Sequence, residues 1–313
     1  MNALLDVILP VFLVIGAGYA AARWMGFGPT AVDGVMKFAQ TYAVPCMLFR
    51  GVSQVDLGAD AEIGLFLSFY IGAFTAFALG YLSARHIFGR GPEDAVAIGF
   101  ACLFSNSLLL GVPITERAYG AEALAGNFTI IALHSPLFYT FGIVAMELAK
   151  SRGRPPGHFG SLLASIGKGI VRQPLVIGVM SGLAVNLTGL PLPGFLTGGL
   201  DMLVRAAVPA ALFGLGGILL RYRPEGDMKT IAMVVAMSIL VHPAIVYGLG
   251  HFVFDLSTPQ LRSAVVTAAM APGVNAYLFA DMYGRARRVN ASAVLIATAA
   301  SIVTIWVWLQ ILP

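Results

Sequence analysis

The composition of this 313-residue chain is that of a membrane protein, since 58% of its residues are hydrophobic and only 11% are charged, whereas about a quarter of a soluble domain is charged. The net charge of +4 is spread over short loops, so we expect no nucleic-acid partner. Cys46 and Cys102 have neither metal-ligand nor redox spacing. We therefore predict an all-α polytopic membrane protein without a metal or a cofactor.

Ten apolar segments approach the length of about 20 residues that a bilayer-spanning helix requires. They lie near residues 4–22, 31–52, 62–84, 94–118, 122–148, 170–187, 198–220, 229–253, 261–283 and 289–312. Of the 19 lysines and arginines, all but Arg50, Arg117, Arg205 and Arg262 lie in or beside the odd-numbered loops. We expect a protein of the plasma (inner cell) membrane. Because positive charge accumulates on the cytoplasmic side, both termini would lie outside, and the loop between spans five and six would be cytoplasmic.

The ten spans divide into two halves of five, residues 1–149 and 170–313, joined by a basic cytoplasmic linker at 150–169. Related features recur 164 positions apart: AVPCMLF at 43–49 and AVPAALF at 207–213, Pro10 and Pro174, Gly18 and Gly182. An odd number of spans per half makes such a repeat inverted, a recurring design of secondary transporters. The alternative is that proline and glycine simply recur in membrane helices. Gly178 and Gly182 also form a small-residue face suited to close helix packing.

Helix-breaking residues occur in the fourth and ninth spans, which occupy corresponding places in the two halves. The fourth contains NSLLLGVPI at 106–114, and the ninth contains APGVNAYLFA at 271–280. Proline lacks a helical N–H, and broken backbone persists at membrane depth only where protein or a water-filled cavity satisfies it. Paired breaks would bring helix N-termini and two asparagine amides together, as in an anion site. The alternative is a packing kink. The candidate binding residues are Ser105, Asn106, Gly111, Pro113, Pro272, Gly273, Asn275 and Tyr277.

Four ionisable side chains within the predicted spans are candidates for ion coupling or anion attraction. His134 and His242 could carry a proton, although an imidazole bonded to a carbonyl freed by Pro243 is the favoured alternative for His242. Arg50 and Arg205 could attract an organic anion, with snorkelling to the lipid headgroups as the alternative. No acidic residue lies at the centre of the fourth or ninth span, so a carboxylate-built Na⁺ site is not expected there.

The layout and several motifs resemble the auxin efflux carrier family, which includes bacterial malonate-type permeases and the plant PIN auxin exporters. The motifs are AVPxxLF in the second span, NSLLLGVPI in the fourth, VHPAIVY in the eighth and APGVNAYLFA in the ninth. The resemblance implies a fold like that of bile-acid and Na⁺/H⁺ transporters. Spans 1, 2, 6 and 7 would form a homodimeric scaffold. Spans 3–5 and 8–10 would form a mobile transport domain that crosses at broken helices 4 and 9, near Asn106, Pro113, Pro272 and Asn275.

These features together favour a secondary transporter for a small organic anion. The expected substrate is a malonate-like or auxin-like carboxylate, moved by elevator-type alternating access within the lipid bilayer, with H⁺ or Na⁺ as the candidate coupling ion. A channel is the main rival, because it also tolerates irregular backbone around a pore, and a transporter-like sensor is another. Neither HExxH nor GxSxG occurs in the chain, so we do not expect an enzyme.

Overall fold

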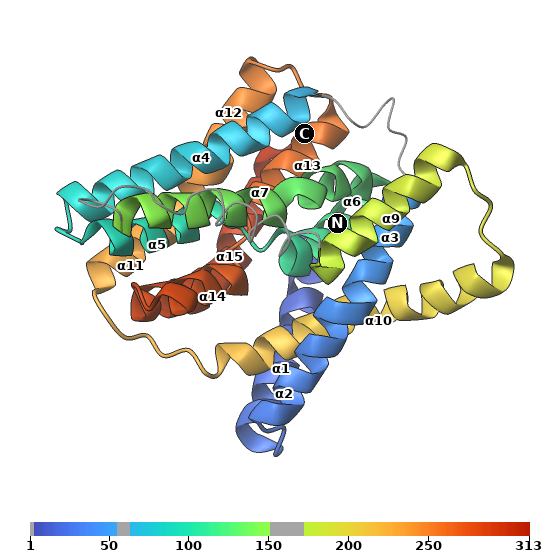
Figure 1. The fold of residues 1–313 in the computed structure, drawn as a ribbon, viewed down its shortest axis with the longest axis horizontal. Helices are drawn as coiled ribbons and strands as arrows, with labels where there is room; N and C mark the ends of the chain where they lie inside the picture. The colour runs from blue at the N-terminus through green and yellow to red at the C-terminus, as the bar shows by residue number, and fades with distance from the viewer. Residues whose placement is uncertain (1–2, 55–62, 151–171) are drawn as a thin grey trace. The chain divides into compact units, whose positions relative to one another are not determined.

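The computed structural model describes residues 3–54, 63–150 and 172–313. These residues form helices together with one isolated β bridge (Figure 1), so the predicted all-α class is confirmed. Within the described ranges, six helices are long and apolar enough to cross a membrane: Leu4–Trp24, Ile63–His86, Ala121–Lys150, Gly194–Leu219, Met228–Phe252 and Arg287–Ile311. The chain is therefore a multi-pass membrane protein. The predicted linker at 150–169 lies outside the described residues, apart from Lys150.

The other four predicted spans correspond to shorter or interrupted helices. The second contains α2 (Pro29–Phe38), the π turn η2 (Ala39–Ala43) and α3 (Val44–Gln54). The fourth contains α5 (Pro92–Leu103), the π turn η3 (Ser107–Gly111) and α6 (Val112–Tyr119). The sixth is α9 (Pro174–Thr188), and the ninth is divided into α13 (Thr258–Ala268) and α14 (Val274–Tyr283).

The chain divides into two compact units, and each is built from segments far apart in the sequence. The larger unit comprises Met1–Leu9, Glu62–Pro156 and Tyr222–Pro313, and the smaller comprises Pro10–Ala61 and Gly157–Arg221. Besides the segments of spans four and nine, the larger unit contains η1 (Ala3–Ile8), α4 (Ile63–His86), η4 (Ala121–Ala123), α7 (Leu124–Lys150), α11 (Met228–Ala236), η5 (Met237–Val241), α12 (His242–Phe252) and α15 (Arg287–Ile311). The smaller unit contains α1 (Leu9–Trp24) from Pro10 onward, α2, α3, α9 and α10 (Gly194–Leu219).

Each of the four π turns ends directly before a residue that precedes proline. The turns are η1, η2, η3 and η5, and the prolines that follow are Pro10, Pro45, Pro113 and Pro243. Proline removes one backbone donor and its ring crowds the carbonyl four residues earlier, and the wider π turn accommodates both effects. The prediction that Gly111 and Pro113 break the fourth span is therefore wrong, because the helix continues through both residues. The span is broken earlier, at the unwound residues 104–106.

Glycines set the distance between helices in the smaller unit. A Cβ atom on Gly178 of α9 would lie 2.4 Å from the carbonyl oxygen of Pro45, and one on Gly182 would lie 2.6 Å from that of Phe49. The two glycines are one helical turn apart, so α9 packs directly on the backbone of α3. This contact confirms the close-packing face predicted for Gly178 and Gly182.

A second glycine contact joins α1 to α10 in the same unit. A Cβ on Gly18 would lie 1.9 Å from the Phe213 carbonyl oxygen, and one on Gly216 would lie 1.9 Å from the Ile15 carbonyl oxygen. Each helix thus places a glycine against the backbone of the other. A methyl group at either position would have to push the helices apart.

The larger unit has a core rich in aromatic side chains. Its helices α4, α5 and α7 lie side by side (Figure 1), and Phe69, Phe100, Phe138 and Phe279 are fully buried. The rings of Phe100 and Phe279 stack nearly parallel, with their centroids 4.0 Å apart and an angle of 16° between the ring planes. This contact fixes α5 against α14, and so holds the ends of the two interrupted spans together.

Candidate functional site

The two unwound segments of the larger unit cross and pair with each other. After α5 ends at Leu103 and α13 ends at Ala268, residues 104–106 and 269–273 run antiparallel, with Ser105 opposite Pro272. The Asn106 N–H donates to the Ala271 carbonyl at 2.8 Å, and the Gly273 N–H donates to the Phe104 carbonyl at 2.9 Å. Each broken segment therefore satisfies backbone groups of the other, which is the condition for irregular backbone inside a membrane.

Both glycines of the predicted site lie against the opposite segment. A Cβ on Gly273 would stand 3.5 Å from Cδ1 of Phe104 and 3.6 Å from Cα of Asn106, and one on Gly111 would stand 3.5 Å from Cγ of Met270. These are ordinary van der Waals distances, so the crossing has room for a methyl group at either glycine. The glycines thus mark close approach without being sterically required.

The chain resumes as a helix directly after the crossing on both segments. One helix starts with η3 at Ser107 and continues as α6, in which Pro113 is the second residue, and the other is α14, which starts at Val274. The first N–H groups of a helix have no partner within it, and its N-terminus carries partial positive charge. The N-termini of two helices therefore lie together at the crossing.

The two predicted asparagines stand at these helix starts. Asn106 immediately precedes η3 and is only 6% exposed, whereas Asn275 is the second residue of α14 and is half-buried. Neither side-chain amide hydrogen-bonds to any other residue that the structure describes. The hydroxyl oxygens of Ser105 and Ser107 lie 2.8 Å apart, and both side chains are buried. Asn106 is thus a mostly buried residue whose amide has its hydrogen-bonding capacity unused.

A buried cluster behind the crossing was not predicted from the sequence. The Nδ2 of Asn127 on α7 donates to the hydroxyl oxygens of Thr115 on α6, at 3.1 Å, and of Thr267 on α13, at 2.9 Å. All three side chains are fully buried. Because Thr115 follows one break and Thr267 precedes the other, Asn127 holds the two interrupted spans in register. The sequence signal that could have indicated this cluster is Asn127, an asparagine within the otherwise apolar fifth span.

The predicted histidines lie on either side of one phenylalanine in the larger unit. The centroid of the Phe69 ring is 5.7 Å from that of His134 and 5.5 Å from that of His242. Both imidazoles are buried, and their four ring nitrogens have no hydrogen-bond partner among the residues described. The ring of His134 also stands edge-on to Phe104, with centroids 4.7 Å apart. His134 therefore contacts the crossing itself.

The favoured alternative for His242 is not found. The carbonyl that Pro243 would leave without its helical donor is that of Ile239, four residues earlier. It accepts a hydrogen bond from Nε1 of Trp308 at 3.1 Å. His242 is thus not needed to satisfy it.

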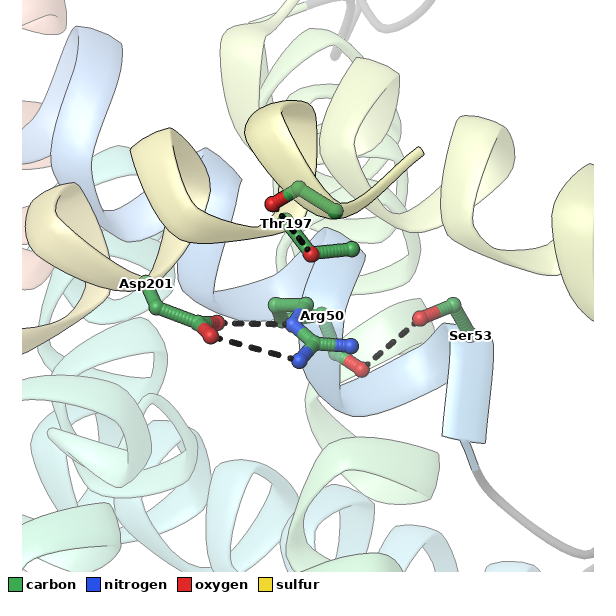
Figure 2. A network of polar contacts seen from close by, with 5 residues as sticks. Arg50, Ser53, Thr197 and Asp201 are labelled. Atoms are coloured by element: carbon green, nitrogen blue, oxygen red, sulfur yellow. Dashed lines mark hydrogen bonds and ion pairs between the residues drawn. The ribbon is translucent and has the colours of Figure 1, made fainter. Parts of the chain in front are cut away.

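The two arginines of the predicted site belong to the smaller unit. Figure 2 shows Arg50 of α3 forming a two-pronged contact with Asp201 of α10, at 2.8 Å from Nε and 3.4 Å from Nη2. Arg205 is exposed one helical turn beyond Asp201. Since the charge of Arg50 is already compensated by a carboxylate, the contact favours a structural role over anion attraction. Asp201 was not predicted from the sequence as the partner of Arg50.

Tyr277, the remaining candidate, lies on α14 with its ring against Tyr222, at a centroid distance of 4.9 Å. The structure therefore brings Ser105, Asn106, Pro272 and Gly273 together at the crossing. Gly111, Pro113, Asn275 and Tyr277 lie on the helices that start there.

The apolar helices and the crossed, interrupted spans define a membrane protein of the transporter class. Residues 3–309 match the sequence model of the family described as membrane transport protein, so the chain belongs to this family, the auxin efflux carrier family that its motifs predicted. The family is one of membrane transporters rather than enzymes.

Three relatives show the breadth of this family. A protein of Rhizobium meliloti (strain 1021) whose name proposes malonate transport is 22% identical over 97% of this chain and 94% of its own length. Auxin efflux carrier component 5 of Arabidopsis thaliana is 20% identical over 95% of this chain and 93% of its own. The lysosomal cholesterol signaling protein of Mus musculus is 22% identical over 100% of this chain but only 38% of its own.

Proposed function

We propose that this protein is a secondary transporter that moves a small organic anion, a malonate-like or auxin-like carboxylate, across the plasma membrane by alternating access. The observation that carries the proposal is the unpartnered amide of Asn106, a mostly buried residue at a crossing where two helices start. Helix N-termini favour anions, and an asparagine amide can donate to a carboxylate. Asn275 would supply the second amide, with Ser105, Gly111, Pro113, Pro272, Gly273 and Tyr277 around it.

The names of the relatives support the choice of substrate class. Malonate and auxin, which appear in the names of two relatives that cover almost the whole chain, are both organic acids. The larger unit itself offers neutral donors and helix dipoles at the crossing, and both candidate arginines belong to the smaller unit. Such a site would hold a carboxylate without binding it so firmly that release becomes slow.

The proposal includes ten spans arranged as an inverted repeat of two five-span halves. Two glycine contacts support the repeat, because Gly18 approaches the backbone of Phe213 and Gly182 approaches that of Phe49. A separation of 164 positions relates Gly18 to Gly182 and also Phe49 to Phe213. The halves thus exchange equivalent contacts, as expected for two copies of one ancestral unit.

The division into two units supports separate roles for them. The smaller unit holds spans 2, 6 and 7 and span 1 from Pro10 onward, and the larger holds spans 3–5 and 8–10. We assign the smaller unit as the scaffold, through which the protein would form a homodimer, and the larger as the domain that carries the substrate in an elevator-type movement. Both termini would lie outside the cell, and the loop between spans five and six would be cytoplasmic.

The test measures transport by purified protein in liposomes on a solid-supported membrane, with jumps of malonate, other dicarboxylates and indole-3-acetate. We expect a saturable response to at least one acid. Asn106→Ala and Asn275→Ala should each weaken it strongly, because a hydrogen bond to a charged group contributes about 1.5–3 kcal/mol, roughly 10- to 150-fold in affinity. Asn186→Ala is the matched control, because Asn186 bonds to Val52 in the smaller unit.

Each outcome of this experiment has a distinct meaning. Wild-type transport by both crossing variants would refute the site. A flux that does not saturate with concentration would favour a channel. Binding of an acid without any transport would favour a transporter-like sensor, a role in line with the name of the signaling relative.

A further inference from the structure

The two buried histidines of the larger unit form one cluster with Phe69 between them. His134 on α7 is 3% exposed, and His242 at the start of α12 is completely buried. Four ring nitrogens lie in this cluster without a partner in the described part of the chain. A buried polar group without a hydrogen bond is costly, so a pair of such groups in one place needs a reason.

The described residues that contact the cluster supply no counter-charge for an imidazolium. Phe69, Phe104 and Phe138 contact the ring of His134, and His242 lies against the same Phe69 ring. The other nearby titratable groups are Tyr70 of α4, whose hydroxyl donates to the Ile130 carbonyl at 2.8 Å, and Tyr139 of α7, packed on Phe104.

Charged groups of the larger unit stand away from this core. None of the fully buried polar side chains in the described ranges is a carboxylate, a lysine or an arginine. The ion pairs of the larger unit join helix ends and loops: Arg90 with Asp227, Lys150 with Glu147, Arg285 with Glu93 and Arg287 with Asp281. Within the described part of the larger unit, a proton bound by the histidines would therefore lack a fixed partner.

We propose that His134 and His242 form a proton-binding site that is loaded when an organic anion occupies the crossing. This inference rests on the proposed function and adds the coupling ion to it. His134 touches Phe104, whose carbonyl accepts the Gly273 N–H. A carboxylate at Asn106, two residues beyond Phe104, would thus supply the missing negative charge.

One proton accompanies each anion in this scheme. Two imidazolium ions on either side of one phenylalanine would repel each other, so the cluster takes up a single proton, and His134 carries it because it contacts the crossing. A monocarboxylate would then move without net charge, and a dicarboxylate would carry one net negative charge. Since coupling is reciprocal, the anion raises proton affinity by the same factor as the proton raises anion affinity.

The experiment measures substrate affinity by calorimetry between pH 5 and 8, together with proton uptake reported by an indicator dye in weak buffer. The probes are malonate and indole-3-acetate. Wild-type protein should take up about one proton per bound anion, with affinity increasing roughly 5- to 150-fold as the pH falls, the usual range of coupling. His134→Gln should bind with nearly pH-independent affinity and without uptake. His251→Gln, at an exposed histidine of α12, should behave like the wild type.

The probe acid's own protonation affects the measured affinity of every variant equally, so comparing variants at the same pH removes this effect. Binding by the wild type without proton uptake would overturn the proton site and leave the anion site standing. Binding of neither acid would overturn both. Because binding without proton uptake by the wild type refutes the proton site by itself, the test stays valid even if His134→Gln does not fold.

Discussion

Replacement of Gly216 by alanine tests whether backbone contact between α1 and α10 stabilises the smaller unit. The new Cβ would lie 1.9 Å from the Ile15 carbonyl oxygen and 2.7 Å from the Tyr19 nitrogen. Close carbon–oxygen contacts between helices are about 3.3 Å long, so the helices must separate locally by about 1.4 Å. Both neighbouring atoms belong to the backbone, so no side-chain rotation can relieve the overlap.

The expected loss of stability follows from that separation. A gap of this size removes a large part of the dispersion energy along the contact, and overpacking in a well-packed core costs about 1–3 kcal/mol. We therefore expect Gly216→Ala to lower the free energy of unfolding by about 3 kcal/mol, at the upper end of this range. Gly182→Ala, with its Cβ 2.6 Å from the Phe49 oxygen, should lose less, about 1 kcal/mol.

The control is Gly198→Ala on the exposed side of α10, where no atom lies within 4 Å of the new Cβ. Alanine is a better helix former than glycine, so this variant should gain up to about 1 kcal/mol. Reversible unfolding of the detergent-solubilised protein in a denaturing-detergent titration measures all three values. The reasoning is refuted if Gly216→Ala is as stable as the wild type, or if the order of the three variants is reversed.

Three further predictions concern polar contacts elsewhere in the structure. The hydrogen bond from Thr230 holds the pKa of Asp227 below its usual range. The carboxylate therefore stabilises the fold above about pH 3.9, the pKa of an unperturbed aspartate. This contribution is lost as the pH falls through the pKa of Asp227 in the folded protein. Asp227→Asn should thus lower the thermal unfolding midpoint at pH 7 but not below the folded pKa, and an equal loss at both would contradict this. Arg50→Met should be destabilising alone and partly rescued by Asp201→Leu, whereas additive losses would show that the pair is uncoupled. Trp308→Phe leaves a buried carbonyl of η5 without its donor and should cost about 1–3 kcal/mol in unfolding free energy, which chemical denaturation would measure.

The interruptions were predictable from the sequence, but their positions were only partly so. Pro272 and Gly273 lie in the unwound segment of the ninth span, as their chemistry predicts. Pro113 instead follows a π turn, because a proline can be accommodated by widening the helix as well as by ending it. The local sequence around Pro113 does not distinguish the two solutions, since the energy difference depends on what packs against the turn.

The correspondence between the two asparagines is looser than their motifs indicated. The bridge places Ser105 opposite Pro272, so Asn106 follows its bridge residue directly while Asn275 follows at a distance of three residues. The hydrogen-bond partners of Asn127 and Arg50 could not be predicted from the sequence either. Asn127 reaches Thr267, which is 140 positions away, and Arg50 reaches Asp201, which is 151 positions away. Such pairs are determined by how the helices assemble, and no local pattern encodes them.

The crossing is held by two hydrogen bonds between backbone atoms, Asn106 to Ala271 and Gly273 to Phe104. These two bonds do not involve any side chain, and Gly273 has space for a methyl group. During evolution the side chains beside the crossing could change, and with them the ligand, while the backbone pairing stays the same. For protein engineering, the positions of Asn106 and Asn275 are accordingly the ones to randomise first when a different acid is wanted.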